Sequence, residues 1–307
     1  MSALEKLDYF FDKEGVLRTK SNNALFKFTD QEAYETLGEA VDEEVYNLLE
    51  KRCNLIRTSL KPAGATDNDE DVSFIFVSEN CLEKETLLVL LHGSGVVRAG
   101  QWARRLIINN DLECGTQIPY IERALEKDWG VVVLNTNHTS SQDEELKYSR
   151  TPKEHAMTAW KEWAEKSKAD RILVVAHSRG GADVSHVMKT YGGDERIDMI
   201  CLTDSWFDYP QCAIERKTPL LVFNFLARNG DLSKEVEKNE VVELPAGTKI
   251  HEWTSYCSME AIFFLFESKI CPNDISKEIL AEAKKLLRAE KPKNTDDDEP
   301  EAKKKRV

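Results

Sequence analysis

The 307-residue sequence has no apolar run of the roughly 18 or more residues that a transmembrane helix needs. Its first residues, Met1–Lys6, carry early charges and are not followed by the apolar core of a secretory signal, so we expect a protein that is not exported. The seven cysteines are scattered and form no Cys-x-x-Cys pair. Such a set is typical of reduced thiols in the cytosol or nucleus, and it argues against a disulfide framework and against a thiolate zinc site.

Basic residues are outnumbered by acidic ones, with 42 Lys and Arg against 55 Asp and Glu. The formal net charge is −13, which argues against direct nucleic-acid binding by bulk electrostatics. The exception is the C-terminus, where an acidic, proline-containing segment, 294–302, precedes four basic residues, 303–306. Such a composition cannot bury enough apolar area to fold, so residues 291–307 are predicted to be a disordered acidic-basic tail. The basic run is either a nuclear-localisation signal or a solvated end that offsets the acidic run.

The N-terminal residues 1–60 are predicted to be an extension that packs on the main domain. Aromatic clusters within residues 8–28 surround a polar turn and predict a hairpin. Asp30 then fits the N-cap of an amphipathic helix that runs to about Cys53, because apolar residues recur at three- and four-residue steps.

Residues 61–290 are predicted to form one α/β domain, because short apolar segments alternate with helical ones. The predicted strands are 72–77, 86–91, 130–135, the run that begins at Arg171, 197–202, 219–225 and 241–244. Strands that are apolar on both faces indicate a mainly parallel sheet that helices cover on both sides. Helices are predicted over 153–168 and 275–287, the second with a start signal at 272–274.

One strand-to-helix junction fits a nucleophile elbow centred on Ser178. The tight turn of an elbow requires small residues two positions before and two positions after the nucleophile, and these are Ala176 and Gly180. The usual motif has glycine first, so Ala176 is a departure that still meets the steric demand. A plain turn with a capping serine would give the same pentapeptide, but the surrounding pattern favours the elbow and an α/β-hydrolase-like fold.

A glycine-rich turn follows the predicted strand that ends at Leu91. Its residues Gly93, Ser94 and Gly95 lie where α/β-hydrolases place one oxyanion donor, and the backbone N–H of Arg179 would supply the other. A tight strand-to-loop turn of any α/β sheet has a similar composition. The elbow further along the chain makes the oxyanion interpretation the better one.

A serine nucleophile needs a base and an acid, which in this fold follow it in the order acid, histidine. His251 is the histidine that lies well beyond the elbow helix, although a hydrogen-bonded loop histidine is the alternative. Asp204 ends the strand after that helix, and Asp231 follows the next strand, which is the more usual position. Either could orient the imidazole, with Asp208 as a weaker third, and the residues alone do not separate them.

Other polar and aromatic residues fit structural roles better. His138 lies at the end of a predicted strand and could border a pocket, but it has no partner at metal-ligand spacing. His92 and His177 flank the two key turns and are predicted to support them rather than to react. No cofactor or metal site is predicted.

Five segments in combination resemble a known family. They are Leu90–Gly95, Gly130–Asn135, Val175–Gly181, Leu202–Ser205 and His251–Ser255. The combination resembles the Arb-type (Argonaute-binding) domain family, and within it the animal cotranscriptional-regulator branch, over about residues 1–270. That family is a relative of the α/β-hydrolases, which agrees with the fold inferred from the residues.

The resemblance implies a partner-binding role in gene regulation, in the nucleus and the cytoplasm. The implied partners are Argonaute proteins or chromatin and splicing proteins, with no direct nucleic-acid or membrane contact. The nucleophile of the family falls on Ser178, its histidine-glutamate pair on His251 and Glu252, and its threonine-aspartate-serine element on Asp204, which gives that acid extra weight. Two hypotheses result: an interaction protein on a hydrolase scaffold, and a serine hydrolase that cleaves an ester, thioester or amide of a small acyl substrate.

Overall fold

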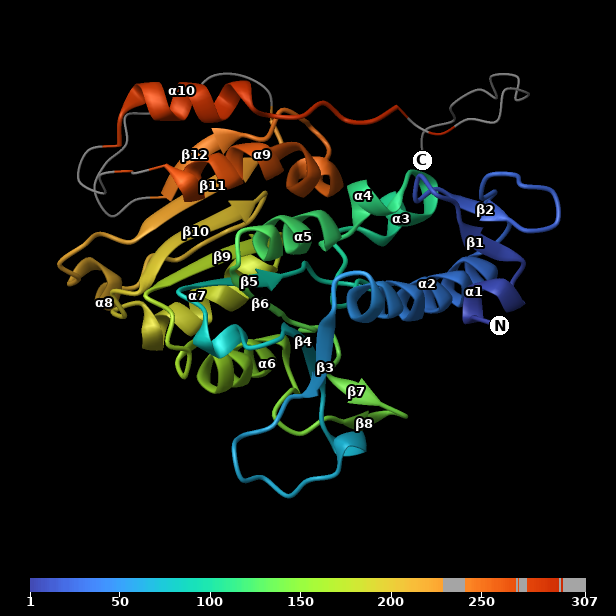
Figure 1. The fold of residues 1–307 in the computed structure, drawn as a ribbon, viewed down its shortest axis with the longest axis horizontal. Coiled ribbons are helices and arrows are strands. Elements are labelled where there is room, and N and C mark those ends of the chain that lie inside the picture. Colours follow the sequence, from blue (N-terminus) through green and yellow to red (C-terminus); the bar gives the residue numbers. More distant parts are fainter. Residues whose placement is uncertain (229–240, 269, 271–274, 293, 295–307) are drawn as a thin grey trace.

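In the computed structural model, which describes residues 1–228, 241–268, 270, 275–292 and 294, one mixed sheet forms the centre of the protein (Figure 1). Its strands are β3 (Leu55–Ser59), β4 (Phe74–Ser78), β5 (Thr86–Leu91), β6 (Gly130–Val133), β9 (Arg171–His177), β10 (Ile197–Thr203), β11 (Leu221–Leu226) and β12 (Val241–Pro245). Their order in the sheet is β3-β4-β6-β5-β9-β10-β11-β12; β4 is antiparallel to β3 and β6, and the other neighbouring strands are parallel. This is the strand order of the α/β-hydrolase fold, and it confirms the predicted fold class.

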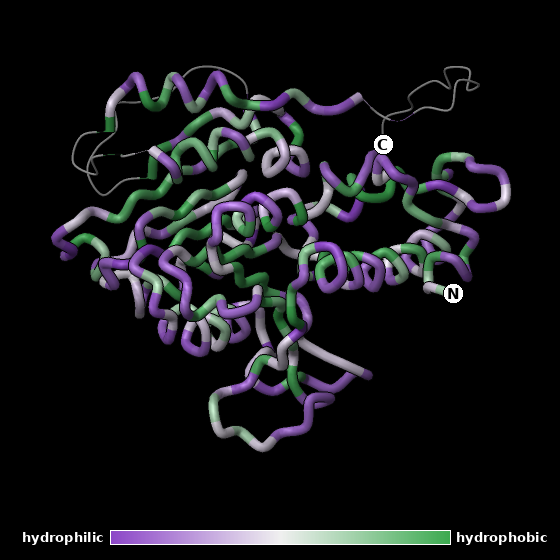
Figure 2. Tube along the Cα trace, in the orientation of Figure 1, coloured by the Kyte–Doolittle hydropathy of each residue, from purple (hydrophilic) through white to green (hydrophobic). Residues whose placement is uncertain are grey.

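Helices cover both faces of this sheet. One face packs against α2 (Gln31–Lys51), α5 (Ile118–Glu126), α9 (Thr254–Glu267) and α10 (Lys277–Lys285), and the other against α6 (Pro152–Ala159), α7 (Gly180–Tyr191) and α8 (Gln211–Ile214). Side chains of β9 alternate between the two cores: Leu173 and Val175 face the first, while Ile172, Val174 and Ala176 face the second. The central strands are therefore hydrophobic along their length (Figure 2), as expected for strands buried on both sides. Among the described residues, no helix combines the length and the apolarity that crossing a bilayer requires.

The N-terminal segment contains the predicted hairpin and helix. Strands β1 (Tyr9–Phe11) and β2 (Leu17–Thr19) pair in antiparallel fashion after the short helix α1 (Ala3–Lys6), and the Asp30 side chain accepts a hydrogen bond from Ala33 N–H at the start of α2. The central sheet, however, begins already inside residues 1–60, at β3. The apolar pattern gave no sign of β3, because Leu55 is its one fully buried residue.

The C-terminal helix α10 begins after Ser276, whose side chain accepts a hydrogen bond from Ile279 N–H. The predicted start signal at 272–274 lies outside the described residues, as do residues 295–307 of the predicted tail. The segment that precedes them is held in place, because Lys291 Nζ lies 2.9 Å from Asp111 Oδ2 and Asn294 Nδ2 donates to Asn110 O at 2.6 Å. The short elements α3 (Arg104–Asn109), α4 (Leu112–Gly115), β7 (Ser140–Ser141) and β8 (Glu144–Glu145) were not predicted.

Buried histidines lie beneath the edge of the sheet where the parallel strands end. His155 of α6 is fully buried, and its Nε2 accepts the backbone N–H of Asn135 at 3.0 Å. Its Nδ1–H therefore donates to Ser149 Oγ at 2.9 Å, and that hydroxyl donates onward to His138 O. Burial lowers the pKa of His155 well below its usual range, so the ring is neutral. Protonation would set an N–H of the ring against the N–H of Asn135.

The burial of these histidines predicts that the free energy of unfolding falls in mild acid. Burial lowers the pKa of His92 to about 4 and that of His177 to about 3, as well as that of His155, against about 6.5 in the unfolded chain. The unfolded chain therefore takes up protons first as the pH falls. The stability that these neutral histidines contribute to the fold is fully present above about pH 6.5. It is lost as the pH falls towards 4, at up to about 1.4 kcal/mol of unfolding free energy per pH unit for each histidine.

Urea unfolding at a series of pH values measures this loss of stability. The variant His155→Gln keeps an acceptor for Asn135 N–H but cannot be protonated. Its free energy of unfolding should therefore fall less steeply with decreasing pH, by up to about 1.4 kcal/mol per pH unit, the contribution of one proton. A wild-type stability that is flat between pH 6.5 and 4.5, or a variant with an unchanged slope, would contradict the assignment.

Candidate active site

The predicted elbow is present at the junction of β9 and α7. Ser178 has a φ of +53°, a left-handed conformation that is uncommon for a residue with a side chain and is typical of strained functional turns. The turn is tight because Gly180 lies against the end of β5, where an added Cβ would be 2.8 Å from His92 O. At Gly181 an added Cβ would be 2.7 Å from Trp206 O. Larger residues at these two positions would push the turn away from both neighbouring loops.

A histidine and a carboxylate meet beside this turn. His251 Nδ1 lies 2.6 Å from Asp204 Oδ2, and since a carboxylate only accepts hydrogen bonds, Nδ1–H is the donor. This bond fixes the tautomer that leaves Nε2 of His251 free to accept a proton. Asp204 Oδ1 also accepts Ala227 N–H at 2.9 Å, so both carboxylate oxygens are held. Asp204 itself adopts a positive φ of +48°, a second strained position within the site.

Neighbouring contacts bring Ser178 and His251 to the same place. The ring of His177, the residue directly before the serine, lies 4.6 Å from the ring of His251 between centroids. His177 is fixed in turn, because its Nδ1–H donates to Thr203 O at 3.0 Å. Within the described part of the chain, Ser178 Oγ makes no hydrogen bond to His251. Such catalytic hydrogen bonds often form only when substrate is bound.

The glycine-rich turn lies on the other side of the serine. A Cβ on Gly93 would be 3.0 Å from Ser178 Cβ and 3.5 Å from its Oγ, so a larger residue at Gly93 would crowd Ser178. The carbonyl of Gly93 accepts His92 Nδ1–H at 2.8 Å and Asn137 Nδ2–H at 2.9 Å. In a trans peptide the N–H of Ser94 points away from that carbonyl, so these two bonds also set the direction of the Ser94 donor.

The sequence predictions for the site have different outcomes in the structure. Ser178, His251, Asp204 and the turn 93–95 lie together, and the N–H of Arg179 stands at the start of α7, where it donates to no described residue. Asp231 lies outside the described residues. Asp208 faces Lys189 at 3.4 Å, not His251.

One contributor to the site, Asn137, was missed. It also donates to Val97 O, and its place two residues after the predicted strand 130–135 was the available signal. Nδ1 of His138 lies 3.0 Å from Ser73 Oγ, and its ring packs on the ring of Phe74. Within the described ranges, no group of three or more histidine, cysteine or acidic side chains is arranged to hold a metal ion.

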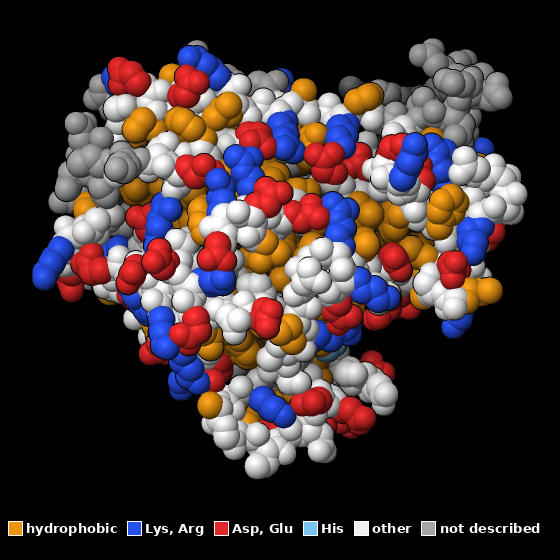
Figure 3. Space-filling model, in the orientation of Figure 1, with side chains coloured by type: hydrophobic (Ala, Val, Ile, Leu, Met, Phe, Trp, Pro, Cys, Tyr) orange, Lys and Arg blue, Asp and Glu red, His pale blue; other side chains and the backbone are white. Residues whose placement is uncertain are grey.

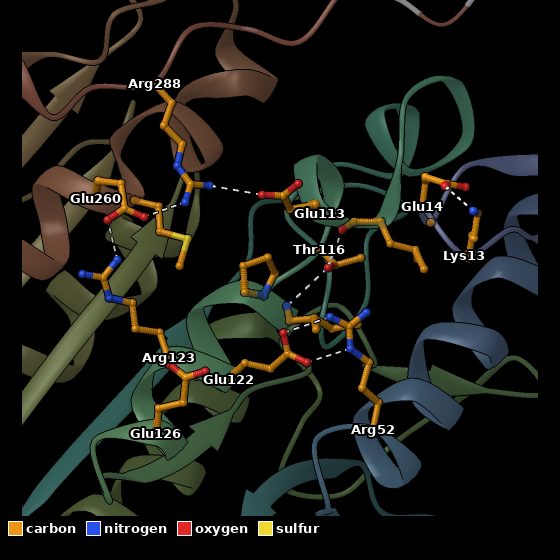
Figure 4. A pocket seen from close by; sticks show the side chains of 15 residues that line it. Lys13, Glu14, Arg52, Glu113, Thr116, Glu122, Arg123, Glu126, Glu260 and Arg288 are labelled. Carbon is orange, nitrogen blue, oxygen red and sulfur yellow. Dashed lines mark hydrogen bonds and ion pairs between the residues drawn. The ribbon is translucent and has the colours of Figure 1, made fainter.

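A charged cavity of about 460 Å³ lies elsewhere, between α4, α5 and α9 (Figure 4). Its lining contains none of the candidate catalytic residues. Its arginines are paired with carboxylates: Arg52 with Glu122, Arg123 with Glu260, and Arg288 with Glu113 and Glu260. These pairs tie the extension and the C-terminal segment to the main domain.

Comparison with known proteins identifies relatives along the whole chain. A FAM172 family protein homolog from Caenorhabditis elegans is 57% identical over 99% of this chain and 99% of its own length. The protein named cotranscriptional regulator ARB2A from Homo sapiens is 34% identical over 86% of this chain and 79% of its own length.

Solved structures give weaker likenesses. A histone deacetylase from Saccharomyces cerevisiae superposes with a TM-score of 0.48 at 14% identity over 76% of this chain and 98% of that chain. The carboxylesterase EstE1 superposes with a TM-score of 0.33 at 17% identity over 56% of this chain and 54% of that chain. Neither likeness carries an argument about activity.

The family is defined by a sequence model. The model of the Arb2 domain matches residues 2–229, which include the N-terminal extension, the elbow and Asp204. Together with the similarity to relatives over most of the chain, this match agrees with the resemblance seen in the sequence. The chain belongs to the Arb2 domain family.

Proposed function

We propose that this protein regulates gene expression through protein partners, and that these partners are Argonaute, chromatin or splicing proteins. The observation that carries the proposal is the similarity to proteins named cotranscriptional regulator ARB2A, at 34% and 35% identity over 86% of this chain. The similarity extends across both the extension and the sheet, so the whole folded unit would act in this role, and it would act in the nucleus.

The charge distribution supports contact with proteins rather than with nucleic acid. The net charge is −13, and on the face drawn in Figure 3 Lys and Arg side chains are interspersed with Asp and Glu side chains. The face drawn shows no continuous basic stripe of the kind that phosphate binding uses. Any association with RNA would then be mediated by a partner.

The second candidate function is acyl transfer at Ser178, and the hydrogen bond between His251 and Asp204 favours it. Ser178 Oγ would attack the carbonyl carbon of an ester, thioester or amide while His251 Nε2 takes its proton. The N–H groups of Ser94 and Arg179 would hold the oxyanion. Collapse of the intermediate would break the bond to the leaving group, which takes the proton from His251, and water would then release the acid and restore the serine.

A fluorophosphonate probe, which phosphonylates activated serines, tests this chemistry directly. The wild-type protein should react, and Ser178→Ala and His251→Ala should lose labelling by about 1,000-fold or more, because both groups act as a unit. Asp204→Asn should also react slowly, since the imidazole loses the carboxylate that sets its tautomer. Asp208→Asn is the matched control on the same loop, and labelling of it should equal that of wild type. An unlabelled, well-folded wild type would refute the enzymatic function.

The regulatory function is tested by affinity purification of the wild type and of Ser178→Ala from cells. Both should recover the same Argonaute, chromatin or splicing proteins in similar amounts, because partners would contact the surface and not the nucleophile. Recovery of none of these classes would reject the proposal. Recovery by the wild type alone would show that binding depends on the serine.

A further inference from the structure

The turn that carries the candidate oxyanion donors has an exposed tip between two buried ends. Ser94, Gly95 and Val96 are exposed, whereas Gly93 and Val97 are buried. Gly95 has a φ of +94°, a conformation that favours glycine. Because these three residues are exposed, few neighbouring atoms fix them directly. The position of their N–H groups therefore depends on how the two buried ends of the turn are held.

The inner end is held from within the main domain. As described above, His92 and Asn137 both donate to Gly93 O. His92 is fully buried, and Asn137 also donates to Val97 O at 3.1 Å. These hydrogen bonds fix the peptide bond between Gly93 and Ser94. They do not fix the carbonyl of Val96, at the outer end of the tip.

The outer end is held by Arg104 of α3, which is paired with the N-terminal extension. Arg104 Nη2 donates to Val96 O at 2.6 Å and to Asp42 Oδ2 of α2 at 2.5 Å. Both charged residues are buried, with 6% of Arg104 and 8% of Asp42 exposed. A buried ion pair keeps its geometry because neither charge can turn to water without breaking the pair. The guanidinium therefore connects the helix to the carbonyl that follows Gly95.

Further contacts of α2 keep the rest of the turn in register. Gln101 Nε2 donates to Asp42 Oδ1 at 2.6 Å, so both oxygens of this carboxylate serve the same segment. Gly100, with a φ of +83°, packs so closely on α2 that an added Cβ would be 2.9 Å from Val45 Cγ1. Ala99 N–H donates to Asn135 Oδ1 at 2.9 Å. The segment therefore contacts α2 at Gly100 and Gln101, while Ala99 is held by Asn135 of the main domain.

We propose that Asp42 and Arg104 are positioning residues for the oxyanion donors, so that α2 of the N-terminal extension is a working part of the candidate active site. This inference rests on the proposed acyl transfer at Ser178 and adds to it how the hole is held open. Neither residue touches the reacting atoms. They act through Val96 O, which fixes the outer end of the tip that carries the Ser94 and Gly95 N–H groups.

Gly38 of α2 offers a sharp test, because alanine in a helix interior is ordinarily more stable than glycine. A Cβ at this position would lie 2.5 Å from Arg104 Nη1 and 3.0 Å from its Cζ. Gly38→Ala should therefore displace the guanidinium without weakening the helix. Glu39→Ala, the neighbouring exposed position of the same helix, is the matched control.

The measurement is the rate of fluorophosphonate labelling as a function of pH. In Gly38→Ala the maximal rate should fall by about 10- to 100-fold, the effect of a misplaced catalytic group, while the pH midpoint stays that of the wild type because His251 and Asp204 are untouched. Glu39→Ala should match the wild type in both respects. The double variant Asp42→Asn/Arg104→Met, which buries no unpaired charge, should fold and label as slowly as Gly38→Ala. A wild-type maximal rate in both variants, or a shifted midpoint with no loss of rate, would overturn the proposal.

Amide hydrogen exchange separates a failure of this inference from a failure of the proposed chemistry, because it needs no activity. In Gly38→Ala the amides of Ala99 and Gly100 should exchange faster than in the wild type, while those of β9 keep their protection. If the wild type does not label but these amides exchange faster in Gly38→Ala, acyl transfer is refuted. The positioning of the turn by α2 is then still supported. If the amides of the turn and of β9 change together, or not at all, the positioning role is refuted.

Discussion

The close approach of three loops at one edge of the sheet is the constraint on which the site depends. Strands β5, β9 and β10 are neighbours and run in parallel, so the loops that follow them begin at the same edge. Glycine at 93, 180 and 181 allows these loops to touch, because an added Cβ at each position would lie 3.0 Å or less from an atom of an adjacent loop. Only then can an acid that follows β10 stand near a serine that follows β9. The hydrogen bond between Asp204 and His251 is thus a consequence of backbone packing as well as of side-chain chemistry.

Much of this arrangement could be predicted because its signals are local. The apolar runs predicted the strands with small shifts at their ends, and the residues around Ser178 predicted the elbow, since the small positions reflect a local steric demand. The choice between Asp204 and Asp231 could not be made in this way. It depends on where the loop before α9 returns to the sheet, which is a property of tertiary packing. The hydrogen bond of His251 to Asp204 now favours that acid.

The missed features share a different cause. β3 is largely exposed, and α3 and α4 span six and four residues, too few for a periodic pattern to be recognised. Asn137 binds carbonyls that are 44 and 40 residues away, and Asp42 pairs with Arg104 across 62 residues. The sequence alone does not indicate such distant partners. The extension was predicted only to pack on the main domain. Its contacts with the turn after β5 give it a more specific role.

Backbone strain at the site bears on the proposed acyl transfer. Ser178 and Asp204 both adopt a positive φ, which costs on the order of 1–3 kcal/mol at each position and persists only where the surrounding packing imposes it. Here that packing includes the hydrogen bonds to Gly93 O and Val96 O at the two ends of the turn beside Ser178. It also includes buried histidines, whose burial favours the neutral ring. A surface that merely binds partners requires none of these features, because docking depends on exposed side chains. Other residues of the described chain also adopt a positive φ, but Ser178 and Asp204 are two of the side chains that acyl transfer would use, and the strain at these two positions therefore supports the proposed chemistry.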